Sequence, residues 1–198
     1  YGNSTFVAVG NSGTILTSSD GTTWTSRTSG VSAELSGVTY GNSIFVTVGQ
    51  SGTILTSPDG TTWTSRTSGT SNQFNGVTYG NSTFVTVGNS GIIFTSSDGT
   101  TWTSRTSGLS DNGRGITYGN STFVAVGNSG GISTSSDGTT WTSRTSGTSE
   151  SITGVTYGSS IFIAVGNSGT ILTSSDGTTW TSRTSGTSNN FSGITFSQ

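Results

Sequence analysis

The 198-residue sequence contains no cysteine, histidine, methionine or lysine, and it has a single proline. Without cysteine and histidine, the usual thiolate and imidazole ligands of zinc are missing, and disulfides cannot stabilise the fold. Without lysine as well, the common nucleophile–base pairs of enzymes are missing. We therefore expect no metal site and no cofactor, and we expect that the protein is not an enzyme.

Charge is also scarce. Charged residues make up 7% of the chain, the net charge is −2, and no run of one sign occurs. This argues against nucleic acid or an anionic membrane as a partner. No apolar stretch approaches the roughly 18 residues of a membrane span, so we expect no membrane insertion. Abundant Ser, Thr and Gly without Lys or Cys fits bacterial surface proteins, and we expect an extracellular or cell-surface location.

What the sequence does contain is a repeat. It restarts at Tyr1, Tyr40, Tyr79, Tyr118 and Tyr157, always 39 residues further on. A fixed period of this size indicates a repeat architecture. Every copy keeps a spaced set of large apolar residues, which a disordered linker has no reason to keep. Because the chain lacks methionine and begins within a repeat, we expect it to be a piece of something longer.

Each copy contains four short segments with the character of strands. In the first copy these are residues 5–10, 14–18, 23–28 and 37–40, and the apolar run 6–9 is typical of a strand buried on both faces. Four strands in about 40 residues is the size of one propeller blade. We therefore predict an all-β fold, in which residues 1–198 form a single, monomeric five-bladed β-propeller with four antiparallel strands per blade.

The two ends of the chain predict how the ring closes. The chain begins at the end of an innermost strand and finishes with Gly193-Ile194-Thr195-Phe196, an innermost strand with no blade after it. Phe196 stands where the next copy would have its tyrosine. We expect this C-terminal strand to complete the first blade, which would leave no long exposed edge.

One motif returns in all copies, with Pro58 as its single substitution: Ser18-Ser19-Asp20-Gly21-Thr22-Thr23-Trp24 in the first. It resembles the Asp-box of the sialidase-type repeat family, Ser-x-Asp-x-Gly-x-Thr-Trp, with one residue missing between Asp and Gly. The resemblance implies a propeller in which the box lies in the turn between the two outer strands, away from any active site. The number of blades is similar to that of tachylectin-type lectins, which place sugar sites between blades.

The chemistry of this motif favours a structural role. An Asp carboxylate can accept hydrogen bonds from the amides of its own turn, and the Trp can fill the space between blades. Truncating a core Trp would cost roughly 3–5 kcal/mol. Metal binding or acid catalysis would instead need a second carboxylate or a His nearby. The residues assigned this structural role are Asp20, Trp24, Asp59, Trp63, Asp98, Trp102, Asp137, Trp141, Asp176 and Trp180.

An arginine follows each Trp by three residues: Arg27, Arg66, Arg105, Arg144 and Arg183. One interpretation is an inter-blade hydrogen bond from each guanidinium to backbone or to an Asp. The other is a ring of guanidinium groups that recognise anions.

The copies differ mainly in one loop, at residues 31–36, 70–75, 109–114, 148–153 and 187–192. This loop should connect the outermost strand to the innermost strand of the next blade, along the face where propellers usually bind ligands. A constant scaffold with diversified loops is typical of a binding protein, although exposed loops also drift. One position is apolar in four copies, Leu35, Phe74, Ile152 and Phe191, and we expect it to anchor the loop.

The candidate ligand-binding residues are the polar members of these loops: Glu34, Gln73, Asp111, Asn112, Arg114, Glu150, Asn189 and Asn190. The preceding turns, such as 11–13, could offer backbone amides. The three loop carboxylates lie in different copies, so nothing pairs them for glycoside hydrolysis. We expect a non-enzymatic recognition module, lectin-like toward glycans or directed at a surface protein. The alternative is a structural spacer, or a designed or recently amplified repeat protein, with no specific ligand.

Overall fold

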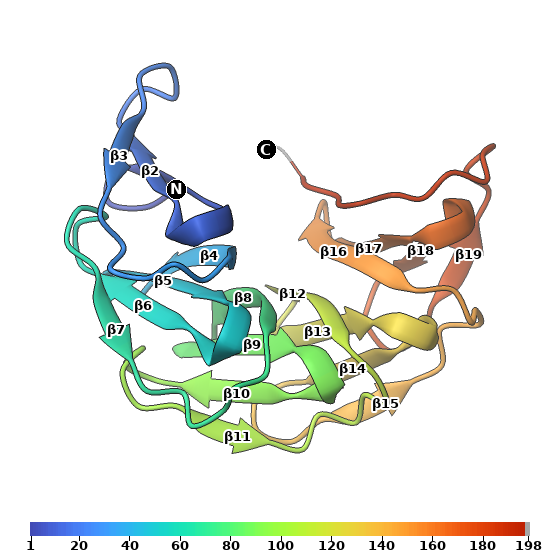
Figure 1. Cartoon of the computed structure of the whole chain (residues 1–198). Helices are drawn as coiled ribbons and strands as arrows, with labels where there is room; N and C mark the ends of the chain where they lie inside the picture. The colour runs from blue at the N-terminus through green and yellow to red at the C-terminus, as the bar shows by residue number, and fades with distance from the viewer. Residues whose placement is uncertain (197–198) are drawn as a thin grey trace.

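The computed structural model describes residues 1–196, and its strands form five antiparallel sheets arranged around an axis (Figure 1). Counted outward from the axis, the first strands are β4 (Leu35–Gly41), β8 (Phe74–Gly80), β12 (Gly113–Gly119) and β16 (Ile152–Gly158). The second strands are β1 (Phe6–Val9), β5 (Ile44–Gly49), β9 (Thr83–Gly88), β13 (Thr122–Gly127) and β17 (Ile161–Gly166).

The third strands are β2 (Ile15–Ser18), β6 (Ile54–Ser57), β10 (Ile93–Ser96), β14 (Ile132–Ser135) and β18 (Ile171–Ser174). The fourth strands are β3 (Thr25–Arg27), β7 (Thr64–Arg66), β11 (Thr103–Arg105), β15 (Thr142–Arg144) and β19 (Thr181–Arg183). Short 3-10 turns join second to third strands: η1 (Asn11–Gly13), η2 (Gln50–Gly52), η3 (Asn89–Gly91), η4 (Asn128–Gly130) and η5 (Asn167–Gly169).

Blade 1 is the three-stranded sheet β1–β3, and blades 2 to 5 are the four-stranded sheets β4–β7, β8–β11, β12–β15 and β16–β19. The all-β, five-bladed propeller predicted from the repeat is therefore confirmed. The fourth strand is shorter than expected, and the first strand begins two residues earlier, at Leu35 in blade 2.

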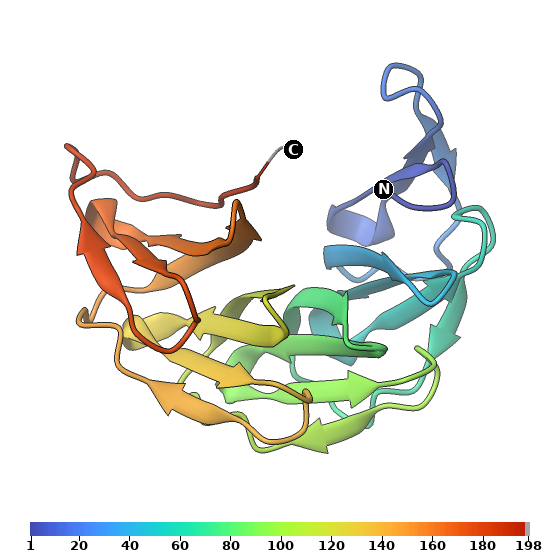
Figure 2. The ribbon, with the colours of Figure 1, turned by 180° about the vertical axis from the view of Figure 1, so that it is seen from behind.

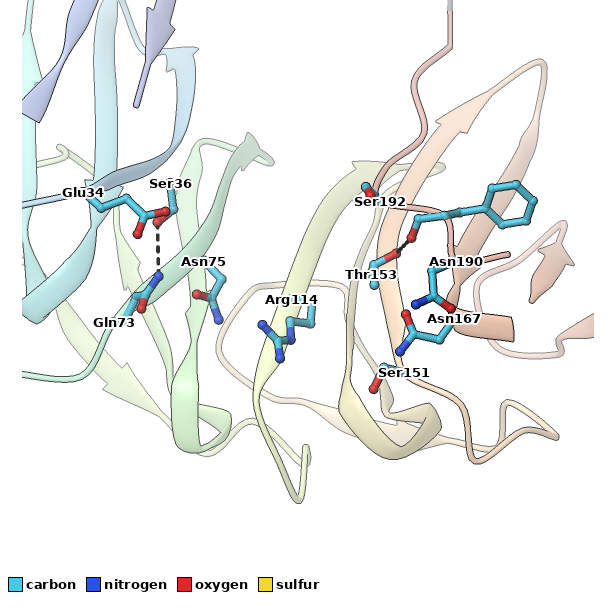
Figure 3. A pocket seen from close by; sticks show the side chains of 11 residues that line it. Glu34, Ser36, Gln73, Asn75, Arg114, Ser151, Thr153, Asn167, Asn190 and Ser192 are labelled. Carbon is cyan, nitrogen blue, oxygen red and sulfur yellow. Dashed lines mark hydrogen bonds between the residues drawn. The ribbon is translucent and has the colours of Figure 1, made fainter. Parts of the chain in front are cut away.

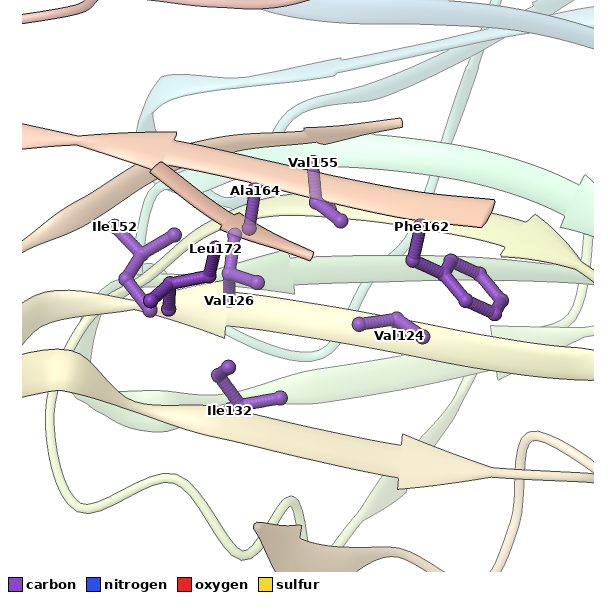
Figure 4. Close-up of a cluster of buried hydrophobic side chains, with 8 residues drawn as sticks. All are labelled: Val124, Val126, Ile132, Ile152, Val155, Phe162, Ala164 and Leu172. Carbon is purple, nitrogen blue, oxygen red and sulfur yellow. The ribbon is translucent and has the colours of Figure 1, made fainter. Parts of the chain in front are cut away.

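The hydrophobic core lies between blades, because neighbouring sheets pack face to face and blades 2 to 4 bury both faces. Between blades 4 and 5, the second and third strands of blade 4 meet the first three strands of blade 5 (Figure 4). The cluster contains Val124, Val126, Ile132, Ile152, Val155, Phe162, Ala164 and Leu172. Further clusters fill the other junctions. Between blades 2 and 3 and between blades 3 and 4, Val and Ile residues of one blade pack with Phe residues of the next. Between blades 1 and 2 the cluster consists of Ile15, Leu35 and Leu55.

The expected closure of the ring by the C-terminal strand is wrong. Blade 1 has three strands, residues 193–196 belong to no strand, and both views show the two ends of the chain apart (Figures 1 and 2). The segment instead lies along β16, with Phe196 stacked over Gly158 as each tyrosine stacks over the glycine one blade earlier. The place that Phe196 would take in blade 1 is occupied by Tyr1, whose ring lies 4.6 Å from that of Phe6.

The open ring exposes residues of blade 1 that are buried in its copies. Phe6 is 38% exposed, whereas its equivalents Phe84 and Phe123 are fully buried. The prediction that the Trp side chains fill the space between blades is confirmed for Trp63, Trp102, Trp141 and Trp180, which pack against the inter-blade clusters, and is wrong for Trp24. Trp24 is 41% exposed, and the other four Trp are half-buried with the indole N–H donating to the carbonyl of the turn glycine.

The turn that carries each repeated Asp is held together by that carboxylate, as expected. We call residues 18–23 and their equivalents the Asp turns. Asp137 Oδ1 accepts the amides of Thr139 and Thr140 at 2.8 and 2.9 Å, and Oδ2 accepts the Thr139 hydroxyl at 2.6 Å. The Thr139 hydroxyl, followed by these two amides, holds the pKa of the Asp137 carboxyl well below its usual range.

Candidate functional site: a polar pocket at the axis

The variable loops have diversified side chains on a fixed backbone. The backbone of each loop is bonded to at least one 3-10 turn of the blades that it joins, and the fourth loop is bonded to both: Gly130 N–H donates to the Glu150 carbonyl at 2.9 Å, and Asn167 N–H to the Ser151 carbonyl at 2.9 Å. These turn amides therefore bind the loop backbone. They are not available to a ligand, contrary to the suggestion from the sequence. A loop fixed in this way presents its side chains without first having to be ordered.

The apolar anchors lie beneath this backbone, as predicted. Leu35, Phe74 and Ile152 are at most 2% exposed, while Phe191, next to the open end of the ring, is half-buried. In the third loop the anchor position is Gly113, and the side chain of Leu109 reaches the space in front of it. A Cβ at Gly113 would lie 3.4 Å from a Leu109 methyl.

A β-bulge follows each anchor and places the next residue at the axis. The pairing of β4 with β5 shifts between Leu35 and Gly37, which leaves Ser36 as the extra residue. The same shift occurs in the three other innermost strands. A bulge re-aims a side chain away from the ladder. The extra residues are Ser36, Asn75, Arg114 and Thr153, and all four line one pocket.

This pocket, which we call the axial pocket, has a volume of about 530 Å³ and opens on the loop face (Figure 3). Its walls come from all five loops, and polar side chains dominate them. The lining residues are Glu34, Ser36, Gln73, Asn75, Arg114, Ser151, Thr153, Asn167, Asn190, Phe191 and Ser192.

One carboxylate and one guanidinium lie among these neutral groups. Arg114 Nε donates to Asn128 Oδ1 at 2.8 Å, which fixes the plane of the guanidinium. Asn75 Nδ2 donates to the Gly113 carbonyl at 2.7 Å and to Asn89 Oδ1 at 3.0 Å, which leaves its own oxygen for a ligand. The Glu34 side chain is exposed and forms no hydrogen bond with another described residue, so it is free to accept donors.

The pocket contains half of the residues that the sequence singled out. Glu34, Gln73, Arg114 and Asn190 line it. Asp111, Asn112, Glu150 and Asn189 do not, and two of these side chains bind backbone amides instead: Asp111 Oδ1 accepts the Asn112 amide at 2.6 Å. Asn112 Oδ1 in turn accepts the Ser90 amide at 2.7 Å.

Sequence reasoning missed the bulge residues other than Arg114. A signal for them was present, because the position directly before the invariant Gly37 and its equivalents remains polar in every copy and yet differs between copies. It reads Ser36, Asn75, Arg114, Thr153 and Ser192. Ser151 and Asn167, contributed by a loop and by η5, were missed as well.

The expected role of the repeated arginines needs a correction. Each donates from Nε to a threonine hydroxyl of the third strand in its own blade, as Arg105 does to Thr95 Oγ1 at 2.9 Å. The bond is therefore within a blade, and the acceptor is neither backbone nor Asp. Among residues 1–196 no cluster of three or more His, Cys, Asp or Glu side chains could hold a metal ion. No helix of this part of the chain is long and apolar enough to cross a bilayer.

The fold defines the protein as a repeat β-propeller, and comparisons with known proteins agree. No family model and no curated protein matches the chain. A solved structure titled "YCF48 bound to D1 peptide" is 22% identical with a TM-score of 0.66, over 88% of this chain and 62% of that one. YCF48 from Cyanidioschyzon merolae is 22% identical with a TM-score of 0.62, over 83% of this chain and 60% of that one.

The computationally designed Ika4 protein is also similar, at 16% identity and a TM-score of 0.60, over 72% of this chain and 91% of that one. At these identities the likeness concerns the fold alone. The chain spans about three fifths of the length of the two YCF48 proteins.

Proposed function

We propose that this protein is a non-enzymatic recognition module that binds a segment of a partner polypeptide in the axial pocket. The observation that carries the proposal is the repeated β-bulge, which directs one diversified polar residue of each innermost strand into a shared pocket. Structural residues of the repeat stay constant, whereas the pocket differs from copy to copy. That division is typical of a scaffold that presents a binding surface.

The chemistry of the pocket suits a peptide. Side-chain amides both donate and accept hydrogen bonds, as peptide groups do, and Gln73, Asn75, Asn167 and Asn190 supply four of them. Glu34 and Arg114 add one site for a cation and one for an anion. The similar structure titled as bound to a peptide supports the same class of ligand. Glu34 is the one carboxylate that lines the pocket, which supports a role without acid–base catalysis.

We further propose that the Asp turns are a shortened Asp-box with a purely structural role. Because the chain is rich in Ser, Thr and Gly and lacks Lys and Cys, we also propose that the protein works outside the cell or at its surface. Sugar hydroxyls would also pair with amides and hydroxyls, so a glycan is the competing ligand and belongs in the test.

The test uses variants that copy residues the chain already carries at equivalent positions. Arg114→Ser copies Ser36 and Ser192, and Glu34→Asn copies Asn112 and Asn190. A random peptide library and a glycan array are screened against the parent chain and the double variant. We expect peptides that bind the parent and lose at least tenfold in affinity on the double variant, measured by titration calorimetry.

Asp111→Asn is the matched control, since Asp111 lies outside the pocket and Asn stands at positions 72 and 189. It should bind these peptides as the parent does. Ligands found only on the glycan array would replace the peptide with a sugar. If no ligand is found in either screen, or if the double variant binds as tightly as the parent, a structural spacer is favoured.

A further inference from the structure

A second kind of cavity lies between neighbouring blades, away from the axial pocket. Between blades 3 and 4 it has a volume of about 240 Å³, and between blades 4 and 5 an equivalent cavity measures about 250 Å³. We call these two cavities the junction pockets. The first is lined by Thr83, Thr95, Ser97, Thr103, Arg105 and Thr139, among other hydroxyl residues. The second is lined by the residues 39 positions further on.

Each junction pocket contains one guanidinium among hydroxyl groups. Arg105 Nε donates to Thr95 Oγ1 at 2.9 Å, and Arg144 Nε donates to Thr134 Oγ1 at 2.8 Å. Neither arginine forms an ion pair or donates from its two Nη groups to another residue within 1–196. The Nε bond therefore holds the planar fork in place and leaves its outer donors for a ligand.

We propose that the junction pockets bind a small oxyanion, that is, a sulfate, phosphate or carboxylate group. The fork of Nη donors matches two oxygens of such a group at once. The hydroxyls of Ser97 and Thr103 line the same pocket and supply further donors. A cavity of this size holds a small anion or the acidic end of a larger ligand. This site is independent of the axial pocket and of the proposed function.

The carboxylates of the Asp turns beside the pocket do not satisfy the guanidinium. Asp98 and Asp137 belong to the Asp turns at the edge of the pocket, and their oxygens accept the amides and hydroxyls of those turns. Their negative charge weakens the attraction for an anion. We therefore expect binding that depends on salt and that favours ligands able to use both Nη groups.

The repeat supplies its own pocket-filling substitution. The position of Thr83 and Thr122 is occupied by isoleucine in two other copies, at Ile44 and Ile161. Ile44 extends so far toward the Asp turn of the next blade that a Cβ at Gly99 would lie 2.6 Å from its Cδ1. Thr83 ends further away, with its methyl 3.5 Å from a Cβ at the equivalent Gly138. Isoleucine thus takes up space that threonine leaves open.

The experiment follows the side-chain Nε–H signals of the arginines by NMR during titration with sodium sulfate, sodium phosphate or sodium acetate. Sodium chloride at matched ionic strength is the reference. We expect saturable shifts for Arg105 and Arg144 and smaller ones for Arg66, whose blade carries Ile44. The double variant Thr83→Ile/Thr122→Ile should lose at least tenfold in affinity. It should fold as the parent does, because the same scaffold already accommodates Ile44 and Ile161.

The double variant Arg105→Gln/Arg144→Gln should lose the binding as well. Because this variant lacks the two arginine NMR signals, its binding is measured by calorimetry. Preference for sulfate and phosphate, or for acetate, then identifies which kind of acidic group the ligand carries. Shifts that are linear in concentration, or equal for the five repeated arginines, would show an adventitious ion only. Undiminished binding by the isoleucine variant would also overturn the proposal.

Discussion

At the scale of single residues, the Asp turns show how one carboxylate stabilises a turn in a chain that has few charges for ion pairs. With so few charges, no ion pair holds these turns, and the carboxylate accepts amide and hydroxyl groups instead. The sequence predicted this bond, because Asp is the residue that most readily accepts amides two and three positions further on. It could not predict that the neighbouring Trp would remain half-buried, which depends on how far apart the blades stand.

These bonds predict a loss of stability in acid. The carboxyl pKa of each Asp turn lies below its unfolded value of 3.8, so the stabilisation is complete above that value. It disappears as the pH falls through the lower folded value. Urea unfolding at about pH 7 and about pH 2.5 should therefore give a smaller free energy of unfolding in acid.

The variant Asp137→Asn tests the cause of that loss. It should be less stable than the parent at neutral pH and should lose less on acidification, because one of the five titrating groups is gone. An equal loss in parent and variant would assign the acid sensitivity to other groups.

At the scale of elements, the site depends on the contact between each variable loop and the turns beside it. The strands could be predicted from their apolar runs, since Phe123–Val126 contains no polar residue and each of its equivalents contains at most one, a threonine. The bulge could not, because it arises where the loop backbone is bonded to the neighbouring turn and the ladder must absorb one extra residue. Ser36, Asn75 and Thr153 were missed for this reason.

Two glycines with the same extended backbone test this contact. A Cβ at Gly127 would overlap the Asn112 carbonyl of the loop, whereas nothing lies within 4 Å of a Cβ at the equivalent Gly10. Gly127→Ala should therefore destabilise the protein by about 1–3 kcal/mol, as overpacking does, and Gly10→Ala should change stability little. Urea unfolding of both variants measures the two changes in the free energy of unfolding. Equal changes would mean that the loop backbone moves to accommodate the added methyl group.

At the scale of the whole molecule, the number of repeats predicted the number of blades but not the closure of the ring. The angle between neighbouring blades is set by side-chain packing at each junction, which the repeat count does not contain. The four junctions together leave an arc with its ends apart (Figures 1 and 2). In addition, Tyr1 and Phe196 could each fill the one aromatic position beside Phe6. Tyr1 occupies that position.

The open ring predicts that identical sequences differ in stability according to their position. Residues 3–13 and 120–130 have the same sequence, so their amides share intrinsic exchange rates. The strand β1 pairs with β2 alone and carries an exposed Phe6, whereas β13 pairs on both sides and buries Phe123. Local opening costs less where fewer contacts are lost, so β1 amides should exchange faster. Hydrogen exchange can separate the two copies with peptides that extend to Thr14 or to Gly131. Equal protection would mean that the edge of blade 1 is covered in solution, by residues 193–196 if it is independent of protein concentration and by a second molecule if it is not.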